Sequence, residues 1–271
     1  MAYQFSLAHL TTLGCTPTEM TYIAARAGYD FVSLRLIPMG VPGDNACLPE
    51  DREMIRKTKA ALDETGIQLL DLELARIIAD MNPKAYVPAM EVAAELGARH
   101  VISSAWTPEQ SDRDFIVERY AEICDLALPF GLTVDLEFPS FSRLTSLQAA
   151  ADIVRAANRP NGGILIDTLY FHFSSVPPKE LDLLPPEWFH FMHICDTAKE
   201  IPSTREGMIH IARDNRLYVG EGCIDFISII ERLPPIPFSI ELPNAEQVRQ
   251  LGYEGHARKC LETAKQYLYN A

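Results

Sequence analysis

Residues 133–168 read TVDLEFPSFSRLTSLQAAADIVRAANRPNGGILIDT. This stretch begins with an apolar run typical of a β-strand, Thr133–Phe138, and passes through a helix-like segment, Ser146–Ala157. It then returns to a second strand-like run, Gly163–Thr168. Parallel strands need a crossover connection of this kind, which is usually an α-helix. The stretch therefore predicts one strand–helix–strand unit of a parallel α/β protein.

The same alternation continues on both sides of this unit. The other strand-like runs are Gln4–His9, Phe31–Leu36, Ile67–Leu74, His100–Ala105, Phe189–Cys195 and Phe238–Leu242. The other helix-like segments are Pro17–Ala27, Pro49–Thr65, Pro83–Leu96, Asp112–Leu128 and Tyr253–Leu268. Eight strands alternating with helices predict an α/β fold, a (β/α)8 barrel, as a single domain over residues 1–271. A doubly wound sheet is the alternative, but the first strand-to-helix turn lacks the GxGxxG pattern.

Side-chain parity indicates which residues face the inside of the barrel, because successive residues of a strand point alternately inward and outward. The residues predicted to face inward are Thr133, Asp135, Glu137, Leu69, Asp71, Glu73, Ser33, Arg35, Asp167 and Glu241. Those predicted to face the helix layer include Leu70, Leu72 and Leu74. Polar side chains then converge at the carboxyl ends of the strands, where the active sites of such barrels lie.

Two connections are irregular in pattern. The segment 196–224 is predicted to be a long loop at the mouth of the barrel, and loops of this length in compact domains are usually functional. Residues 169–187 contain four prolines and are also predicted to be irregular.

Four apolar runs end on or near a residue that can bind a divalent metal. These residues are Glu137, Asp167, His193 and Glu241. A charge at the end of a buried strand is costly unless it is paired or ligated. Two Glu, one Asp and one His together predict a single site for Mn, Mg, Co or Zn, with open positions left for a substrate. The alternative is four unrelated polar residues, each satisfied by its own neighbours.

Composition limits the partners of the protein. No apolar run reaches the roughly 18 residues of a membrane span, and the start of the chain lacks the basic region of a signal peptide. Six cysteines without a CxxC pair predict a cytoplasmic protein with reduced core thiols. The net charge of −13 disfavours binding to nucleic acid. A small-molecule substrate is the expected partner, and a homo-oligomer is possible.

Several motifs together resemble a known family, the xylose-isomerase-like TIM barrels that include the sugar phosphate isomerases and epimerases. The resemblance spans essentially the whole chain and rests on Leu136-Glu137, Ile166-Asp167-Thr168, His193-Ile-Cys-Asp196, Arg216–Asp225 and Ile240-Glu241. It implies that Glu137, Asp167, His193 and Glu241 hold one divalent metal ion. Members usually carry a histidine three residues after the strand-six Asp. Tyr170 stands at that position here, and His172 is the nearby histidine.

The resemblance implies an isomerase or epimerase that acts on a small keto-sugar, polyol or sugar acid through an enediolate intermediate. Glu137 and Glu241 are then the catalytic acid–base pair. A metal-dependent lyase, a dehydratase of the 3-dehydroshikimate or keto-inositol type, is the alternative. An AP-endonuclease-like hydrolase and a non-catalytic binding domain are less favoured than either enzyme.

Six residues are candidates for binding the substrate: His9, Arg35, Glu73, His172, Arg205 and Arg216. Most of them also have a purely structural interpretation. Arg35 and Glu73 could form an ion pair in the barrel mouth, and His9 could be a satisfied rim histidine. Arg205 and Arg216 could be solvated loop charges. Four further histidines, which show no ligand spacing, are predicted to be structural: His100, His190, His210 and His256.

Overall fold

Eight parallel strands form a closed barrel in the order β1 to β8, in a computed structural model that describes residues 3–39, 47–107 and 113–270. The strands are β1 (Phe5–Leu7), β2 (Phe31–Arg35), β3 (Gln68–Ile77), β4 (His100–Ala105), β5 (Thr133–Glu137), β6 (Gly162–Asp167), β7 (Met192–Ile194) and β8 (Phe238–Ile240). Each overlaps one of the predicted runs. The (β/α)8 barrel predicted from the sequence is therefore confirmed.

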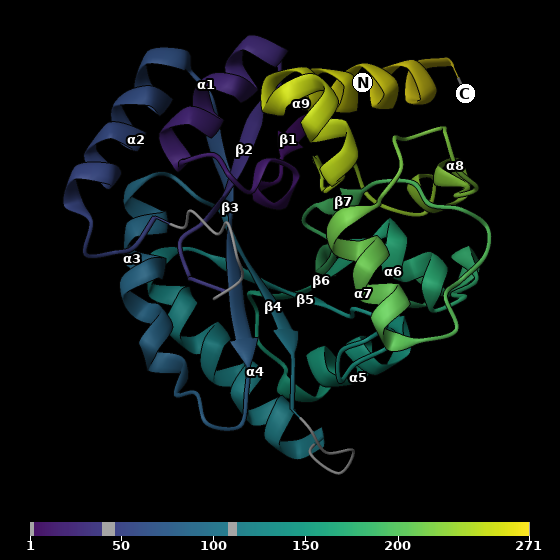
Figure 1. The fold of residues 1–271 in the computed structure, drawn as a ribbon. Helices are drawn as coiled ribbons and strands as arrows, with labels where there is room; N and C mark the ends of the chain where they lie inside the picture. Colours follow the sequence, from purple (N-terminus) through teal and green to yellow (C-terminus); the bar gives the residue numbers. More distant parts are fainter. Residues whose placement is uncertain (1–2, 40–46, 108–112, 271) are drawn as a thin grey trace.

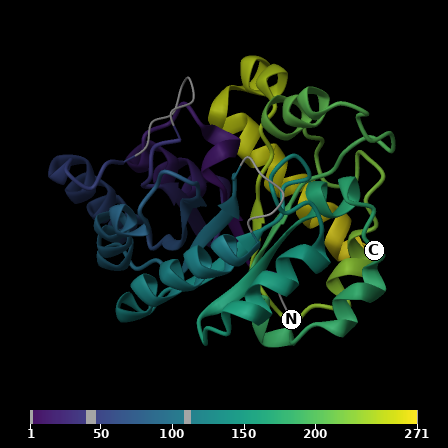
Figure 2. The same cartoon turned by 90° about the horizontal axis from the view of Figure 1, so that it is seen from below.

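Helices surround the barrel, as Figures 1 and 2 show. They are α1 (Pro17–Ala27), α2 (Arg52–Thr65), α3 (Val87–Glu95), α4 (Arg113–Ala127), α5 (Leu147–Ala157), α6 (Thr168–Phe173), α7 (Arg205–Asp214), α8 (Phe226–Ile230) and α9 (Ala245–Asn270). Short 3-10 helices are η1 (His9–Thr12), η2 (Pro83–Tyr86), η3 (Leu128–Phe130), η4 (Pro178–Leu183) and η5 (Pro186–Trp188). Within the described ranges, no helix is long and apolar enough to cross a membrane.

Local signals explain why the helices begin and end where they do. Thr16 caps α1 by accepting from the backbone of Glu19, whose side chain in turn accepts from the backbone of Thr16. This reciprocal arrangement satisfies two backbone donors at the start of the helix. The helix ends at Gly28, whose φ of 91° lies in the left-handed region that favours glycine.

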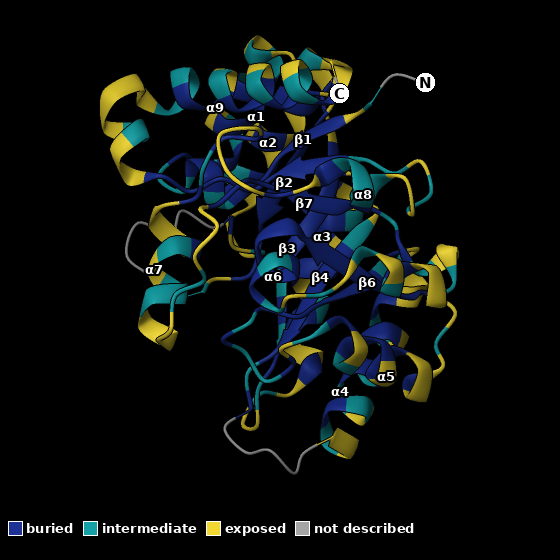
Figure 3. Cartoon of the chain, turned by 90° about the vertical axis from the view of Figure 1, so that its right-hand side faces the viewer, coloured by how far each residue is buried: buried dark blue, intermediate teal, exposed yellow. Residues whose placement is uncertain are grey.

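The core has two parts. The larger part lies between the strands and the helices, and Figure 3 shows buried residues along the strands with exposed residues on the outer faces of the helices. The smaller part is a cluster contributed by β2, β3, β4, β6 and the segment before β7. Its members are Phe31, Leu70, Ile102, Leu165 and Phe191, with Leu74 packed against them. Side chains from strands on different sides of a closed barrel can meet only inside it, so this cluster fills the barrel interior.

The inward-facing pattern of β3 differs from the prediction. Val32 of β2 pairs with Leu69, but Leu34 pairs with Leu72, so β3 contains one extra residue in this interval. Such a β-bulge shifts the alternation of side chains. Leu69 consequently packs in the outer core with Val32, while Leu70 joins the interior cluster. The predicted outward positions of Leu70 and Leu74, and the inward position of Leu69, are therefore wrong.

The segment 196–224 is not only a loop, because it contains α7. Thr204 caps this helix by accepting from the backbone of Gly207. A glycine in the first turn weakens helix propensity, which is why the sequence did not predict a helix here. The irregular segment 169–187 likewise contains most of α6, η4 and part of η5. All six cysteines are free, but Cys223 is exposed rather than part of the core.

Candidate active site

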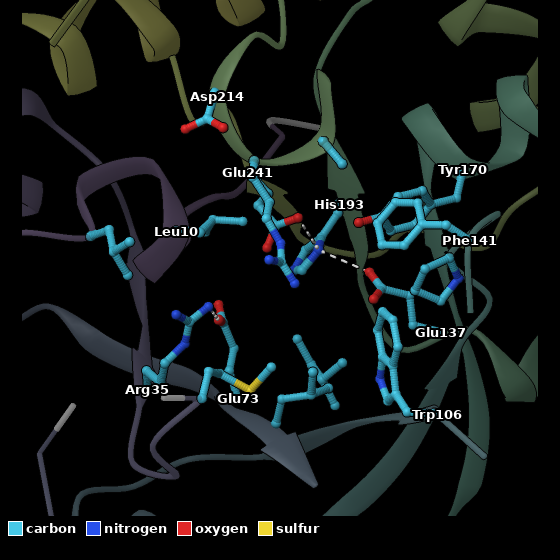
Figure 4. Close-up of a pocket in the computed structure, with 17 residues that line it drawn as sticks. Leu10, Arg35, Glu73, Trp106, Glu137, Phe141, Tyr170, His193, Asp214 and Glu241 are labelled. Atoms are coloured by element: carbon cyan, nitrogen blue, oxygen red, sulfur yellow. Dashed lines mark hydrogen bonds and ion pairs between the residues drawn. The ribbon is translucent and has the colours of Figure 1, made fainter. Parts of the chain in front are cut away.

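The predicted metal quartet is assembled by four neighbouring strands at one end of the barrel. Glu137 and Asp167 are the last residues of β5 and β6, His193 lies in β7, and Glu241 follows β8. One donor atom from each of the four side chains lies within 4.8 Å of the others. The Nδ1 atom of His193 is 3.6 Å from Glu137 Oε1, 3.5 Å from Glu241 Oε2 and 4.0 Å from Asp167 Oδ2. Figure 4 shows the two glutamates on either side of His193.

The donor set fits a divalent metal ion. All four side chains are buried, and neither ring nitrogen of His193 has a hydrogen-bond partner among the described residues. A buried imidazole whose ring nitrogens make no hydrogen bond is costly, whereas a metal ion would satisfy it. Ligands of one ion lie about 2.0–2.3 Å from it, so their atoms are at most about 4.6 Å apart. The spacing of the four donor atoms, within 4.8 Å of one another, is close to this limit.

Arg216 lies directly behind this quartet. Its side chain is fully buried, and its two terminal nitrogens lie 2.7 Å from Asp167 Oδ2 and 2.7 Å from Glu241 Oε2. Its Nε donates to the carbonyl of Ala212, and NH2 donates to the hydroxyl of Tyr170. Arg216 is therefore not a solvated loop charge. It holds two members of the quartet in place and partly neutralises the three carboxylates.

The two glutamates differ in their affinity for a proton. Burial, together with the nearby charge of Glu241, raises the pKa of Glu137 to about 7, although His193 opposes the shift. Burial acts on Glu241 in the same direction, but the attraction of His193 and Arg216 outweighs it and holds the pKa of Glu241 below its ordinary value. In the site without a metal ion, Glu137 therefore holds a proton more readily than Glu241 does.

A cavity of about 370 Å³ lies in front of the quartet. Glu137, His193 and Glu241 form its polar end. Its apolar lining includes Leu10, Leu13, Leu74, Ile102, Trp106 and Phe141. Figure 4 shows Trp106 and Phe141 beside Glu137. The indole of Trp106 donates to the hydroxyl of Ser104, which fixes the orientation of the ring. The cavity thus combines a charged end with rigid apolar walls, as small-molecule sites commonly do.

Arg35 and Glu73 line the same cavity from β2 and β3 (Figure 4). The two residues pair across the neighbouring strands, and Arg35 NH2 lies 3.1 Å from Glu73 Oε2. The other oxygen of Glu73 is buried without a hydrogen-bond partner in the part of the chain that the structure describes. Burial raises the pKa of Glu73, although Arg35 opposes the shift. The predicted ion pair is thus present, and it also faces the cavity.

Three other candidate substrate residues lie outside the cavity lining that the described residues define. His9 is fully buried, and its Nδ1 accepts from the backbone of Arg35. Burial lowers the pKa of His9 to about 3. Arg205 begins α7 and donates to the carbonyl of Phe141, and His172 lies beside Cys223 in a second cavity of about 320 Å³. Substrate contact by these three residues, and by Arg216, remains a prediction.

Several residues that line the cavity were not among the predicted substrate residues. Tyr170 packs edge-on against Phe141, with ring centroids 5.6 Å apart. Tyr170 stands three residues after Asp167, where members of the family usually carry a histidine, and this position could have indicated its place in the cavity. Arg213 and Asp214 reach the cavity from the end of α7. Their role could not be predicted from the sequence because the helix that carries them was not predicted.

Comparison with known proteins agrees with this architecture. Residues 22–265 match the family model described as the xylose isomerase-like TIM barrel. The chain belongs to this family. The resemblance inferred from the sequence motifs is thus confirmed.

Among curated relatives, the inosose isomerase of Bacillus subtilis (strain 168) is 27% identical over 183 residues. The match covers 65% of this chain, which spans about 63% of the length of that relative. Among solved structures, an IOLI protein with a binding zinc atom superimposes with a TM-score of 0.82, at 20% identity and 98% coverage of both chains. D-allulose 3-epimerase from Methylomonas sp. in complex with D-allulose gives a TM-score of 0.71 at 18% identity, covering 97% of this chain and 96% of the other.

Proposed function

We propose that this member of the family is a divalent-metal-dependent isomerase or epimerase that acts on a small keto-sugar, polyol or sugar acid. The observation that carries the proposal is the pair of carboxylates, Glu137 and Glu241, on either side of His193 at the polar end of the cavity. The relatives named inosose isomerase and D-allulose 3-epimerase belong to the same class of enzyme, which supports this choice.

Glu137, Asp167, His193 and Glu241 are the residues that would hold one Mn, Mg, Co or Zn ion. When bound, such an ion polarises a substrate carbonyl and stabilises the negative charge that develops on its oxygen. Asp167 would act only as a ligand, because one of its oxygens accepts from the backbone of Leu169 and the other from Arg216. Arg216 keeps Asp167 and Glu241 in place while the substrate enters and leaves.

The proton transfers belong to the two glutamates. One removes the proton from the carbon next to the carbonyl, which leaves an enediolate, and the other returns a proton. Transfer on one face of the carbon chain gives an isomerase, and transfer on opposite faces gives an epimerase.

The remaining cavity residues would position the substrate and exclude water. Arg35 and Glu73 offer a donor and an acceptor for substrate hydroxyls on the side of β2 and β3. Trp106 and Phe141 offer apolar faces to the C–H groups of a sugar or cyclitol. A volume of about 370 Å³ suits a small substrate.

One observation favours a second candidate, a dehydratase. Burial raises the pKa of Glu73, and one of its oxygens is unpaired within the described ranges. A protonated carboxyl at that position could donate to a leaving hydroxyl after the same enolate has formed. The dehydratase would give a conjugated, ultraviolet-absorbing product, whereas the isomerase would give a product of unchanged mass.

The test is a screen of the metal-free protein reloaded with Mn, Mg, Co or Zn, against keto-inositols, keto-sugars, sugar acids and 3-dehydroshikimate. Proton NMR in deuterium oxide would detect exchange at the carbon next to the carbonyl, as well as any product. Exchange or turnover that disappears on chelation supports the proposal. Efficient turnover by the chelated protein would contradict it.

A further inference from the structure

The opposite end of the barrel carries a second cluster of metal-binding side chains. His100 is the first residue of β4, Asp135 lies in β5, and His190 precedes β7. The aromatic ring of Phe191 lies between the two ends. Its centroid is 5.1 Å from that of His100 and 5.8 Å from that of His193. This basal cluster is therefore separate from the cavity and from the quartet.

The side chains of His100 and His190 converge on the carboxylate of Asp135. Its Oδ1 lies 2.6 Å from His190 Nδ1, and its Oδ2 lies 3.8 Å from His100 Nδ1. Thr133 bridges the second contact, since its hydroxyl is 2.7 Å from His100 Nδ1 and 2.9 Å from Asp135 Oδ2. One donor atom from each of the three lies within 4.8 Å of the others, as in the quartet at the mouth.

The absence of a side chain at Gly163 leaves room for the basal cluster. A Cβ atom on Gly163 would lie 2.6 Å from Asp135 Oδ1 and 2.8 Å from His190 Cε1, so only glycine is compatible with the present arrangement. Asp135 is fully buried, whereas the side chains of His100 and His190 remain 12% and 23% exposed. An ion can thus reach the histidines from solvent, while the carboxylate lies behind them.

We propose that His100, Asp135 and His190 bind a second divalent transition metal ion at the base of the barrel. Two imidazoles and one carboxylate suit zinc or cobalt better than magnesium, which prefers oxygen ligands. The ion would join β4, β5 and the segment before β7. These three parts of the chain are far apart in the sequence but lie close together at the base of the barrel. Its role is structural, because the cluster lies away from the cavity. The proposal is independent of the reaction at the mouth.

The proposal competes with a plain hydrogen-bond network made by the same three side chains and Thr133. The two differ in zinc stoichiometry. The test uses a chain with an impaired mouth, carrying His193→Ala and Glu137→Gln, which removes the imidazole and one carboxylate from the quartet. Zinc per chain is measured after equilibrium dialysis and desalting. The basal site predicts about one ion per chain, and this ion should be lost when His190→Gln is added.

A matched control distinguishes zinc binding at this site from nonspecific zinc binding by an exposed histidine. His210→Gln removes an exposed histidine of α7 and should leave the retained zinc unchanged. Zinc should also raise the melting temperature of the mouth-impaired chain, and His190→Gln should abolish that rise. Should His190→Gln fail to fold, as judged by circular dichroism, Asp135→Asn and His100→Gln provide the same comparison.

Two results would overturn the basal site. The first is a mouth-impaired chain that folds and retains no zinc. The second is zinc retention that is unchanged in every folded variant of His100, Asp135 and His190. Either result would leave the cluster as a hydrogen-bond network.

Discussion

The two ends of the barrel each bring histidine and carboxylate side chains together, but the histidines differ in their hydrogen bonding. At the mouth, His193 is buried between carboxylates without a hydrogen-bond partner among the described residues, and a cavity lies in front of it. At the base, His100 and His190 are engaged with Asp135 and Thr133, and neither histidine lines that cavity. The two ends of the barrel therefore differ less in residue type than in which polar groups lack hydrogen bonds.

Arg216 should produce the largest effect on stability at the mouth. Arg216→Met leaves the carboxylates of Asp167 and Glu241 buried without their cation, which should cost about 3–5 kcal/mol of unfolding free energy in the metal-free protein. Added zinc should recover part of this loss because it neutralises the same carboxylates. Urea denaturation with and without metal measures both effects.

The control for Arg216 is Arg249→Met, which removes an exposed arginine paired with Glu246 on α9. It should change stability by less than about 1 kcal/mol. Equal effects of the two substitutions would contradict the role assigned to Arg216.

The two glutamates proposed to transfer protons should produce the next largest effect, and it should appear in kcat rather than in stability. Glu137→Gln and Glu241→Gln retain the shape and one oxygen donor but remove the charge, so each should lower kcat by on the order of 100-fold, even in excess metal. Exchange of the substrate proton with solvent deuterium then distinguishes the base from the acid. The variant that lacks the acid should still exchange this proton, whereas the variant that lacks the base should not. Glu246→Gln, at an exposed position on α9, is the control and should leave kcat unchanged.

If both losses were modest and fully rescued by excess metal, the two glutamates would be ligands alone. Glu73, which lines the same cavity, would then be the next candidate for the proton transfer.

Arg205 should produce the smallest effect. Its guanidinium donates to the carbonyl of Phe141, which lines the cavity, while the residue is exposed at the surface. Arg205→Ala should therefore raise KM by about a few-fold and change the unfolding free energy by less than about 0.5 kcal/mol. Steady-state kinetics and urea denaturation give the two quantities. Unchanged kinetics would assign Arg205 to the surface alone.

The features that depend on local pattern could be predicted from the sequence. Eight strands followed from short apolar runs between helix-like segments, and the quartet followed from polar residues at four strand ends. Features that depend on register or tertiary packing were missed. The bulge in β3 reversed the side of Leu70, and the burial of Arg216 depends on α7 and on two strands distant in sequence. The basal histidines, His100 and His190, are far apart in the sequence and meet only in the closed barrel.

Binding of a single divalent ion by the mouth quartet underlies the proposed function. An anomalous difference map from crystals of the wild-type protein grown with zinc would test this binding directly. We predict a peak about 2.0–2.3 Å from donor atoms of Glu137, Asp167, His193 and Glu241. If crystals grown in excess zinc show no peak at His193, or show His193 bonded only to protein groups, the quartet does not bind the ion.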